Sequence, residues 1–267
     1  MNIIVTGGHS GIGLELSKML LNEGHKLGLI LRNEKRKEDA LAALGTDKDI
    51  EFFYADLSKQ KEVVNVAETI KNQWDIVNGL FNNAGVLLDQ AYYSDQGNEM
   101  HFEINTLAPY LLAQKLMPLL EQTHSGFVVT TVTGSLHQRN ETSLNVNELK
   151  RPTKFVKLLG SYMQSKFAVA QLMNYMARNH SNVKFVNVDP GPNRTGMTAG
   201  EGMPFLLKPL AKILFPKPIK GATKLYRGAF DDQYEGSGIY ITSNKITPLK
   251  YDADEATIQQ MLDAVVV

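Results

Sequence analysis

Short apolar runs alternate with longer amphipathic stretches along most of this 267-residue chain. The apolar runs have the length of strands and cover seven segments: Ile3–Thr6, Leu27–Leu31, Ile50–Tyr54, Val77–Phe81, Phe127–Val132, Val183–Val188 and Ile239–Ile241. The longer stretches carry apolar residues at helical spacing, and the clearest are Ile12–Asn22, Lys59–Gln73, Met100–Glu121 and Ser161–Asn179. Such alternation predicts an α/β fold, a Rossmann-type doubly wound parallel sheet of about seven strands with helices on both faces.

The composition excludes several functional classes. The 28 basic and 28 acidic residues cancel, so no overall field favours nucleic acid as a partner. The absence of cysteine excludes disulfides, thiolate metal sites and a cysteine nucleophile, and the six histidines show no metal-ligand spacing. We see neither a secretory signal nor an apolar run long enough to span a membrane, so we expect a cytoplasmic protein without a metal.

The chain shows no internal repeat and no linker, which predicts a single domain over residues 1–267. One region breaks the regular pattern, because residues 196–220 scatter glycines and prolines between apolar clusters. A long irregular insertion in an otherwise tight fold is typical of a lid or binding loop. We therefore expect a substrate lid at about residues 196–220.

A glycine-rich turn lies between the first predicted strand and the first predicted helix. It reads Thr6-Gly7-Gly8-His9-Ser10-Gly11-Ile12-Gly13. Gly11 and Gly13 allow the backbone to approach a pyrophosphate, whose charge would meet the free N–H groups at the start of the helix. We therefore expect the eight residues of this turn to bind a dinucleotide.

The spacing of Gly7, Gly11 and Gly13 resembles the T-G-x-x-x-G-x-G turn of the short-chain dehydrogenase/reductase family. Four further motifs of that family follow in the expected order: Asp56-Leu57, Asn82-Asn83-Ala84-Gly85 with Asn105 in the next helix, Tyr162-Met163-Gln164-Ser165-Lys166, and Pro190-Gly191 with Thr195. The resemblance extends over nearly the whole chain. It implies a nicotinamide-dependent oxidoreductase in which these segments bind the cofactor, with Asp56 near the adenine and Thr195 on the nicotinamide amide.

Tyr162 and Lys166 are the predicted catalytic pair. Hydride transfer to a carbonyl needs a proton donor for the developing alkoxide, and the reverse reaction needs a base. A lysine four residues after a tyrosine lies on the same helix face, and we expect its charge, together with that of the oxidised nicotinamide, to lower the tyrosine pKa toward neutrality. In the enzymes that this chain resembles, the lysine also grips the nicotinamide ribose, and the residue corresponding to Asn105 has a structural role and a role in proton relay.

The family places a serine after the fifth strand to hold the substrate carbonyl, and this chain departs from that pattern. An ungapped alignment from Gly126 puts Thr133 at the position, and Ser135 is the alternative. A threonine hydroxyl offers the same donor and acceptor, although its methyl group narrows the pocket.

The end of the second strand favours NADP(H) as the cofactor. Enzymes of this kind that prefer NAD carry an acid there, whereas this chain has Leu31 followed by Arg32. Leu31 cannot repel a 2′-phosphate, Arg32 could pair with one, and His9 could add a contact. Ser10 stands where many NADP(H) enzymes have a second basic residue, so NAD(H) stays as the alternative.

Within the family, the chain is most similar to the branch of retinol dehydrogenases, WW-domain oxidoreductases and protochlorophyllide reductases. This similarity rests on the long stretch between Thr133 and Tyr162 and on the tail from Lys217 to Tyr240. This branch implies a small apolar or aromatic carbonyl or alcohol as substrate. Residues 203–215 are strongly apolar, which fits a lid, a membrane-surface helix or a partner-binding patch.

Two functions from different classes remain open at this point. The first is a carbonyl reductase or alcohol dehydrogenase, and the second is an NADP(H)-binding redox sensor without turnover. The intact Tyr162 and Lys166 favour the enzyme, and Thr133 in place of serine weakly favours the sensor. The resemblance allows a homo-oligomer as well as a monomer.

Overall fold

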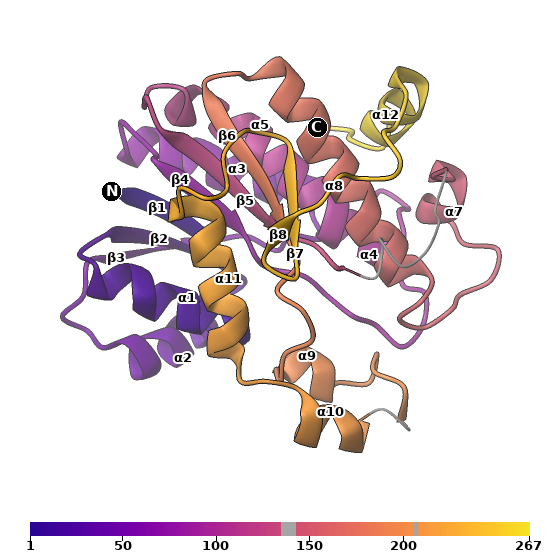
Figure 1. Ribbon diagram of the computed structural model, residues 1–267, viewed down its shortest axis with the longest axis horizontal. Helices are drawn as coiled ribbons and strands as arrows, with labels where there is room; N and C mark the ends of the chain where they lie inside the picture. The colour runs from indigo at the N-terminus through magenta and orange to yellow at the C-terminus, as the bar shows by residue number, and fades with distance from the viewer. Residues whose placement is uncertain (135–142, 206–207) are drawn as a thin grey trace.

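Eight strands form one sheet in the computed structural model, which describes residues 1–134, 143–205 and 208–267. Their order is β3-β2-β1-β4-β5-β6-β7-β8 (Figure 1). The bounds are β1 Asn2–Thr6, β2 Lys26–Leu31, β3 Ile50–Tyr54, β4 Gly79–Asn82, β5 Gly126–Thr131, β6 Val183–Val188, β7 Ile239–Thr242 and β8 Lys245–Ile246. The doubly wound parallel sheet predicted from the sequence is thereby confirmed.

The eighth strand is the difference from the predicted count. β8 pairs antiparallel with β7, across a turn at Ser243 and Asn244 in which both residues have positive φ. A strand of two residues is too short to produce an apolar alternation, so the sequence pattern contained no signal for it. β8 closes the edge of the sheet beyond the parallel strands.

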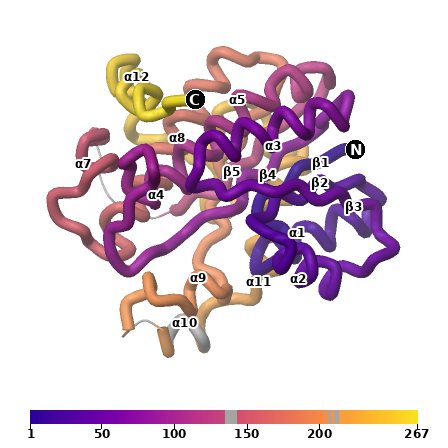
Figure 2. The backbone as a smooth tube through the Cα atoms, turned by 180° about the vertical axis from the view of Figure 1, so that it is seen from behind, coloured from indigo at the N-terminus to yellow at the C-terminus, as the bar shows by residue number. Residues whose placement is uncertain are grey.

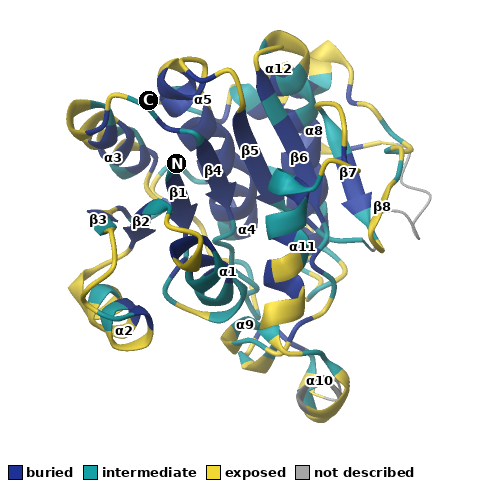
Figure 3. Ribbon diagram, turned by 60° about the vertical axis from the view of Figure 1, so that its left-hand side comes forward, coloured by how far each residue is buried: buried dark blue, intermediate teal, exposed yellow. Residues whose placement is uncertain are grey.

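Two apolar cores lie on the two sides of the sheet, because successive side chains of a strand point to opposite faces. In β1, Ile3 and Val5 belong to one core and Ile4 to the other. Helices α1 (Gly11–Asn22), α2 (Glu34–Leu44) and α11 (Pro218–Phe230) cover the first face. Helices α3 (Gln60–Gln73), α5 (Ala108–Leu120), α8 (Ser161–Asn179) and α12 (Glu255–Leu262) cover the second (Figure 3).

The chain order reverses between β1 and β4, where connections leave the sheet in opposite directions. In open sheets of this kind, ligands bind outside the carboxyl ends of the strands at this reversal point. The glycine turn follows β1 and the Asn82-Asn83-Ala84-Gly85 segment follows β4, so both reach that crevice.

The helix predicted over Met100–Glu121 contains a wider turn. It consists of α4 (Met100–Phe102), a π-helical segment η1 (Glu103–Leu107) and α5. The N–H of Ala108 donates to the carbonyl of Glu103, five residues earlier. Pro109 has no N–H to donate to the carbonyl of Asn105, its α-helical partner, and this removes one bond that would hold an ordinary α-turn.

A buried carboxylate fixes the start of η1. Glu103 is fully buried and accepts hydrogen bonds from Gln60 Nε2 at 2.9 Å, Ser94 Oγ at 2.8 Å and Asn98 Nδ2 at 2.9 Å. Three donors on one carboxylate offset much of the cost of removing it from water. The wide turn is therefore anchored from two segments, the start of α3 and the turn at residues 94–98.

The predicted insertion carries two short helices, α9 (Gly196–Ala199) and α10 (Lys208–Leu214), and its last residues form the first turn of α11. α10 lies away from the sheet, beyond α9, in both backbone views (Figures 1 and 2). Another short helix, α7 (Val146–Lys150), packs near α8 and α12. Among the described helices, none is long and apolar enough to cross a membrane.

Candidate active site

Thr6 joins the glycine turn to the segment that follows β4. Its Oγ1 accepts hydrogen bonds from the backbone N–H groups of Asn83 and Ala84, both at 3.0 Å. The side chain of Asn83 donates back to the Thr6 carbonyl at 3.1 Å. The two predicted cofactor-binding segments are thus locked together at the reversal point.

The backbone of the turn requires glycine at several positions. Gly7 and Gly11 have φ of +69° and +55°, where side chains other than hydrogen are strained. At Gly13, a Cβ would lie 2.3 Å from the Gly7 carbonyl oxygen. Ser10 is the N-cap of α1, but its side chain makes no capping hydrogen bond. The first N–H groups of α1 are therefore available to an anion, as a pyrophosphate requires.

Three basic side chains gather beside the turn, from different elements. His9 Nδ1 is buried and has no hydrogen-bond partner in the described part of the chain. The pKa of His9 is lowered by burial and by the charges of Arg36 and Arg32. Arg32 Nε lies 3.8 Å from Asp56 Oδ2, and its side chain is largely exposed. Leu31, at the position of the acid in NAD-preferring enzymes, is buried. The residues present therefore fit a phosphorylated ribose.

Sequence reasoning missed Arg36. It lies in the first turn of α2, four residues after Arg32, and Asn33 caps this helix by accepting from the Arg36 N–H at 3.2 Å. The Arg36 guanidinium pairs with Asp39 on the same helix, Nη1 to Oδ2 at 3.2 Å, and its charge also acts on His9. The available signal was the spacing, since Arg32 and Arg36 flank the helix cap at Asn33.

The segment after β6 lies over the glycine turn. Gly191 has φ of +73°, and its N–H donates to Asp189 Oδ1 at 2.8 Å. Thr195 then caps α9, and its Cγ2 lies 3.3 Å from the position that a Cβ of Gly11 would occupy. Pro190, Gly191 and Thr195 thus reach the crevice formed by the glycine turn.

Lys166 is buried within α8 and reaches the end of β5. Its Nζ donates to the Thr131 carbonyl at 2.9 Å. The same ammonium borders Gly85, where a Cβ would lie 3.2 Å from Nζ and 2.9 Å from Asn105 Oδ1. Lys166, Gly85 and Asn105 therefore meet at one point, next to Tyr162 one turn earlier on α8.

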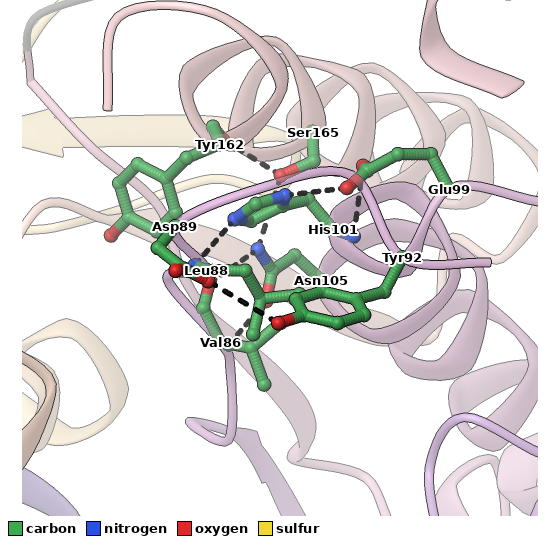
Figure 4. Close-up of polar contacts among 9 residues, drawn as sticks. All are labelled: Val86, Leu88, Asp89, Tyr92, Glu99, His101, Asn105, Tyr162 and Ser165. Carbon is green, nitrogen blue, oxygen red and sulfur yellow. Dashed lines mark hydrogen bonds and ion pairs between the residues drawn. The ribbon is translucent and has the colours of Figure 1, made fainter. Parts of the chain in front are cut away.

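Asn105 occupies the middle of η1 and uses its side chain to hold the segment after β4. Its Oδ1 accepts from the Val86 N–H at 2.8 Å, and its Nδ2 donates to the Val86 carbonyl at 3.0 Å and to Ser165 Oγ at 3.1 Å (Figure 4). These bonds fix Val86 against α8. The structural and proton-relay role of Asn105 stays a prediction.

The chain's own residues shift the tyrosine pKa in the direction opposite to the expected one. Burial, with a smaller contribution from the Asp189 carboxylate, raises the pKa of Tyr162 to about 12. Burial also lowers the pKa of Lys166 to about 8. The Lys166 ammonium is directed at the Thr131 carbonyl, and desolvation outweighs its attraction for a tyrosinate. Tyr162 is therefore a protonated acid near neutral pH.

Thr133 lies just beyond β5, where the carbonyl-binding hydroxyl was expected. Its backbone carbonyl accepts a hydrogen bond from Tyr240 Oη at 2.8 Å, which fixes this stretch against β7. Asp189 approaches closely, since a Cβ on Gly134 would lie 2.1 Å from Asp189 Oδ2. Ser135, the alternative, lies outside the described residues.

His101 is buried beside Tyr162. It is 1% exposed, and its ring meets that of Tyr162 edge to face with centroids 6.1 Å apart. Nε2 accepts from the Leu88 N–H at 2.9 Å, and Nδ1 lies 2.8 Å from Glu99 Oε1 (Figure 4). The overlooked signal was its position four residues before Asn105, on the same side of the helix.

A family model described as short chain dehydrogenase matches residues 1–143, more than half of the chain. The chain belongs to this family. The human protein "Dehydrogenase/reductase SDR family member 12" is 29% identical to this short-chain dehydrogenase over 191 residues, which cover 70% of the chain and 59% of that protein. The polyprenol dehydrogenase of Danio rerio is 30% identical over 267 residues, covering 93% and 81%.

The similarity to solved structures concerns the fold. Salutaridine reductase from Papaver somniferum superposes with a TM-score of 0.70 at 18% identity, over 90% of this chain and 98% of that one. The chain spans about 59% of the length of the first human relative. The family of oxidoreductases, with its NAD(P)-binding Rossmann fold, is thus identified, as the motifs predicted.

Proposed function

We propose that this short-chain dehydrogenase transfers a hydride between NADP(H) and an apolar or aromatic carbonyl or alcohol, with Tyr162 as general acid and base. The observation that carries the proposal is the convergence of Lys166, Asn105 and Gly85 beside Tyr162 at the carboxyl ends of β4 and β5. A redox sensor without turnover would have no need for this arrangement.

The nicotinamide supplies or accepts the hydride when it is bound. The chain supplies the proton, since Tyr162 is protonated near neutral pH and can donate its hydroxyl hydrogen to a developing alkoxide. The Thr133 hydroxyl would hold the substrate oxygen, and Lys166 would hold the ribose hydroxyls. Asn105 keeps Val86 and Ser165 in place around the tyrosine.

The preference for NADP(H) is supported by the charges at the glycine turn. Arg32 and Arg36 both act on His9, whose buried Nδ1 has no partner among the described residues. A 2′-phosphate placed there would receive charge-assisted hydrogen bonds, each contributing about 1.5–3 kcal/mol. Asp56, already hydrogen-bonded to Ser58, is left for the adenine side of the site.

The apolar substrate class is supported by the relatives and by the lid segment. A polyprenol dehydrogenase acts, by its name, on a long apolar alcohol. In this chain Met203 is buried, and Gly202 lies so close to Leu87 that a Cβ would be 2.2 Å from the Leu87 carbonyl oxygen. The predicted lid thus borders, at Gly202, the loop that follows Gly85.

The test is NADPH and NADH oxidation with a panel of apolar and aromatic aldehydes and ketones. Tyr162→Phe should lower the turnover rate by a factor of about 10²–10⁴ and leave NADPH binding unchanged. Tyr175→Phe, on the same helix, is the matched control and should keep activity. Tight NADPH binding without turnover on any carbonyl or alcohol would contradict the proposal and favour the sensor.

A further inference from the structure

Three large apolar side chains lie exposed on and beside α10. Phe205 is 81% exposed, Ile213 78% and Leu214 66%. α10, which ends with Ile213 and Leu214, lies beyond α9 and away from the sheet (Figure 1). Three exposed apolar side chains of this size within ten residues of the chain mark an interaction surface.

The charge around these side chains is strongly positive. Residues 201–220 contain four lysines and one glutamate, a net charge of +3 in a chain whose total charge is 0. Lys208 begins α10, and Lys217 and Lys220 are exposed where the segment joins α11. Lysines interspersed with exposed apolar side chains match an anionic lipid surface. The lipid phosphates attract the lysines, and the apolar side chains insert below the headgroups.

The opposite end of the same segment touches the site. Gly202 packs on Leu87, and Thr195 lies over Gly11. The segment therefore has an inner part at the crevice and an outer part that carries the exposed side chains. A partner that binds the outer part would therefore lie next to the crevice.

We propose that Phe205, Ile213 and Leu214, with Lys208, Lys217 and Lys220, form a docking surface for an anionic lipid bilayer. The chain binds there peripherally, with the apolar side chains inserted at the headgroup level and the lysines on lipid phosphates. Delivery of an apolar substrate from the bilayer to the crevice follows if the proposed function holds, whereas docking itself does not depend on catalysis.

Vesicle co-sedimentation tests the docking directly. The intact chain is mixed with phosphatidylcholine vesicles, or with vesicles that contain about 30% phosphatidylglycerol. We expect binding to the anionic vesicles to be at least about tenfold stronger and to weaken with added salt. The variants Phe205→Ser/Ile213→Ser/Leu214→Ser and Lys208→Glu/Lys217→Glu/Lys220→Glu should each lose at least about tenfold in binding.

Lys245→Glu/Ile246→Ser is the matched control, because both residues are exposed on β8, a different element. It should bind vesicles like the unchanged chain, and thermal melting should show that all variants fold. Tyr162→Phe should also keep vesicle binding, which separates the docking surface from the catalytic proposal. Equal binding by the patch variants, or binding to neither vesicle, would overturn the inference. Self-association abolished by the patch variants, without vesicle binding, would assign the surface to a second copy and likewise overturn it.

Discussion

The imidazole of His101 is held between the carboxylate of Glu99 and the backbone N–H of Leu88. A backbone N–H can only donate, so Nε2 is the acceptor at 2.9 Å, and Nδ1 carries the hydrogen that points at Glu99 Oε1 2.8 Å away. Glu99 also caps α4 by accepting from the His101 N–H at 2.9 Å. One neutral side chain thus connects the loop after Gly85 to the helix of Asn105 and to the ring of Tyr162.

Replacing His101 should loosen both the fold and the site. His101→Phe keeps an aromatic ring beside Tyr162 but leaves the Leu88 N–H and Glu99 without their partner, at a cost of about 2–4 kcal/mol in the free energy of unfolding. We expect kcat/KM to fall about tenfold as the loop shifts. His101→Gln can place an amide oxygen near the Leu88 N–H and should recover part of both losses. Denaturant unfolding and steady-state kinetics check this, and equal losses in the two variants would contradict it.

Removing the arginines should change cofactor choice more than catalysis. For Arg32→Ala/Arg36→Ala we expect NADPH affinity to fall about ten- to a hundredfold, because charge-assisted bonds to the 2′-phosphate are lost, with little change for NADH. Fluorescence titration with both cofactors measures this. Lys35→Ala, exposed on the same helix, is the control and should behave like the unchanged chain. An equal loss for NADH and NADPH would place the arginines outside the ribose site.

Lys166 should destabilise the fold near neutral pH. Its pKa falls from 10.5 to about 8 on folding, so the unfolded chain binds more protons between these values and stability rises with pH there. Below about pH 8 the full cost is present, roughly 3 kcal/mol. Lys166→Met should therefore melt at a higher temperature at pH 7, although it is inactive, and the gap should narrow by pH 10. A gap that stays constant with pH would exclude a charged, desolvated lysine.

The glycine turn should tolerate no side chain at Gly13. Gly13→Ala places a Cβ against the Gly7 carbonyl, and overpacking of this kind costs about 1–3 kcal/mol. The turn would also open, so we expect dinucleotide binding to weaken. Gly196→Ala is the matched control, because a Cβ there has no neighbour within 4 Å. Thermal melting and NADPH titration compare the two, and similar effects would show that the turn is less tightly closed than the structure indicates.

The sequence carried the fold because its central strands are long and apolar. Ile3, Ile4 and Val5 must all be buried, and only a sheet covered on both faces can do this. The short strand β8 and the wide turn around Asn105 were not predictable, since each depends on one local arrangement and neither changes the apolar period. The motif residues Tyr162 and Lys166 were found because spacing along one helix determines their neighbourhood.

The remaining features of the site depend on contacts between distant segments. The sequence shows His101 close to Glu99. It does not show that both are buried or that the backbone N–H of Leu88 donates to His101. It shows a lysine near a tyrosine, but the pKa of Tyr162 depends on how deeply both are desolvated. Thr133 was singled out by alignment alone, and the role of its hydroxyl in holding the substrate oxygen remains a prediction.

The wide turn at Glu103–Leu107 also sets a limit on how this helix can change in length. One extra residue in a turn advances the following helix by about 100°. Before the turn, His101 faces Tyr162 in one orientation of the helix, and after it α5 packs on α3 in another. Substitutions within the turn preserve both orientations. A single-residue deletion would convert it to an ordinary turn and force one half to rotate, so this helix should evolve by exchange of side chains and not by insertion or loss.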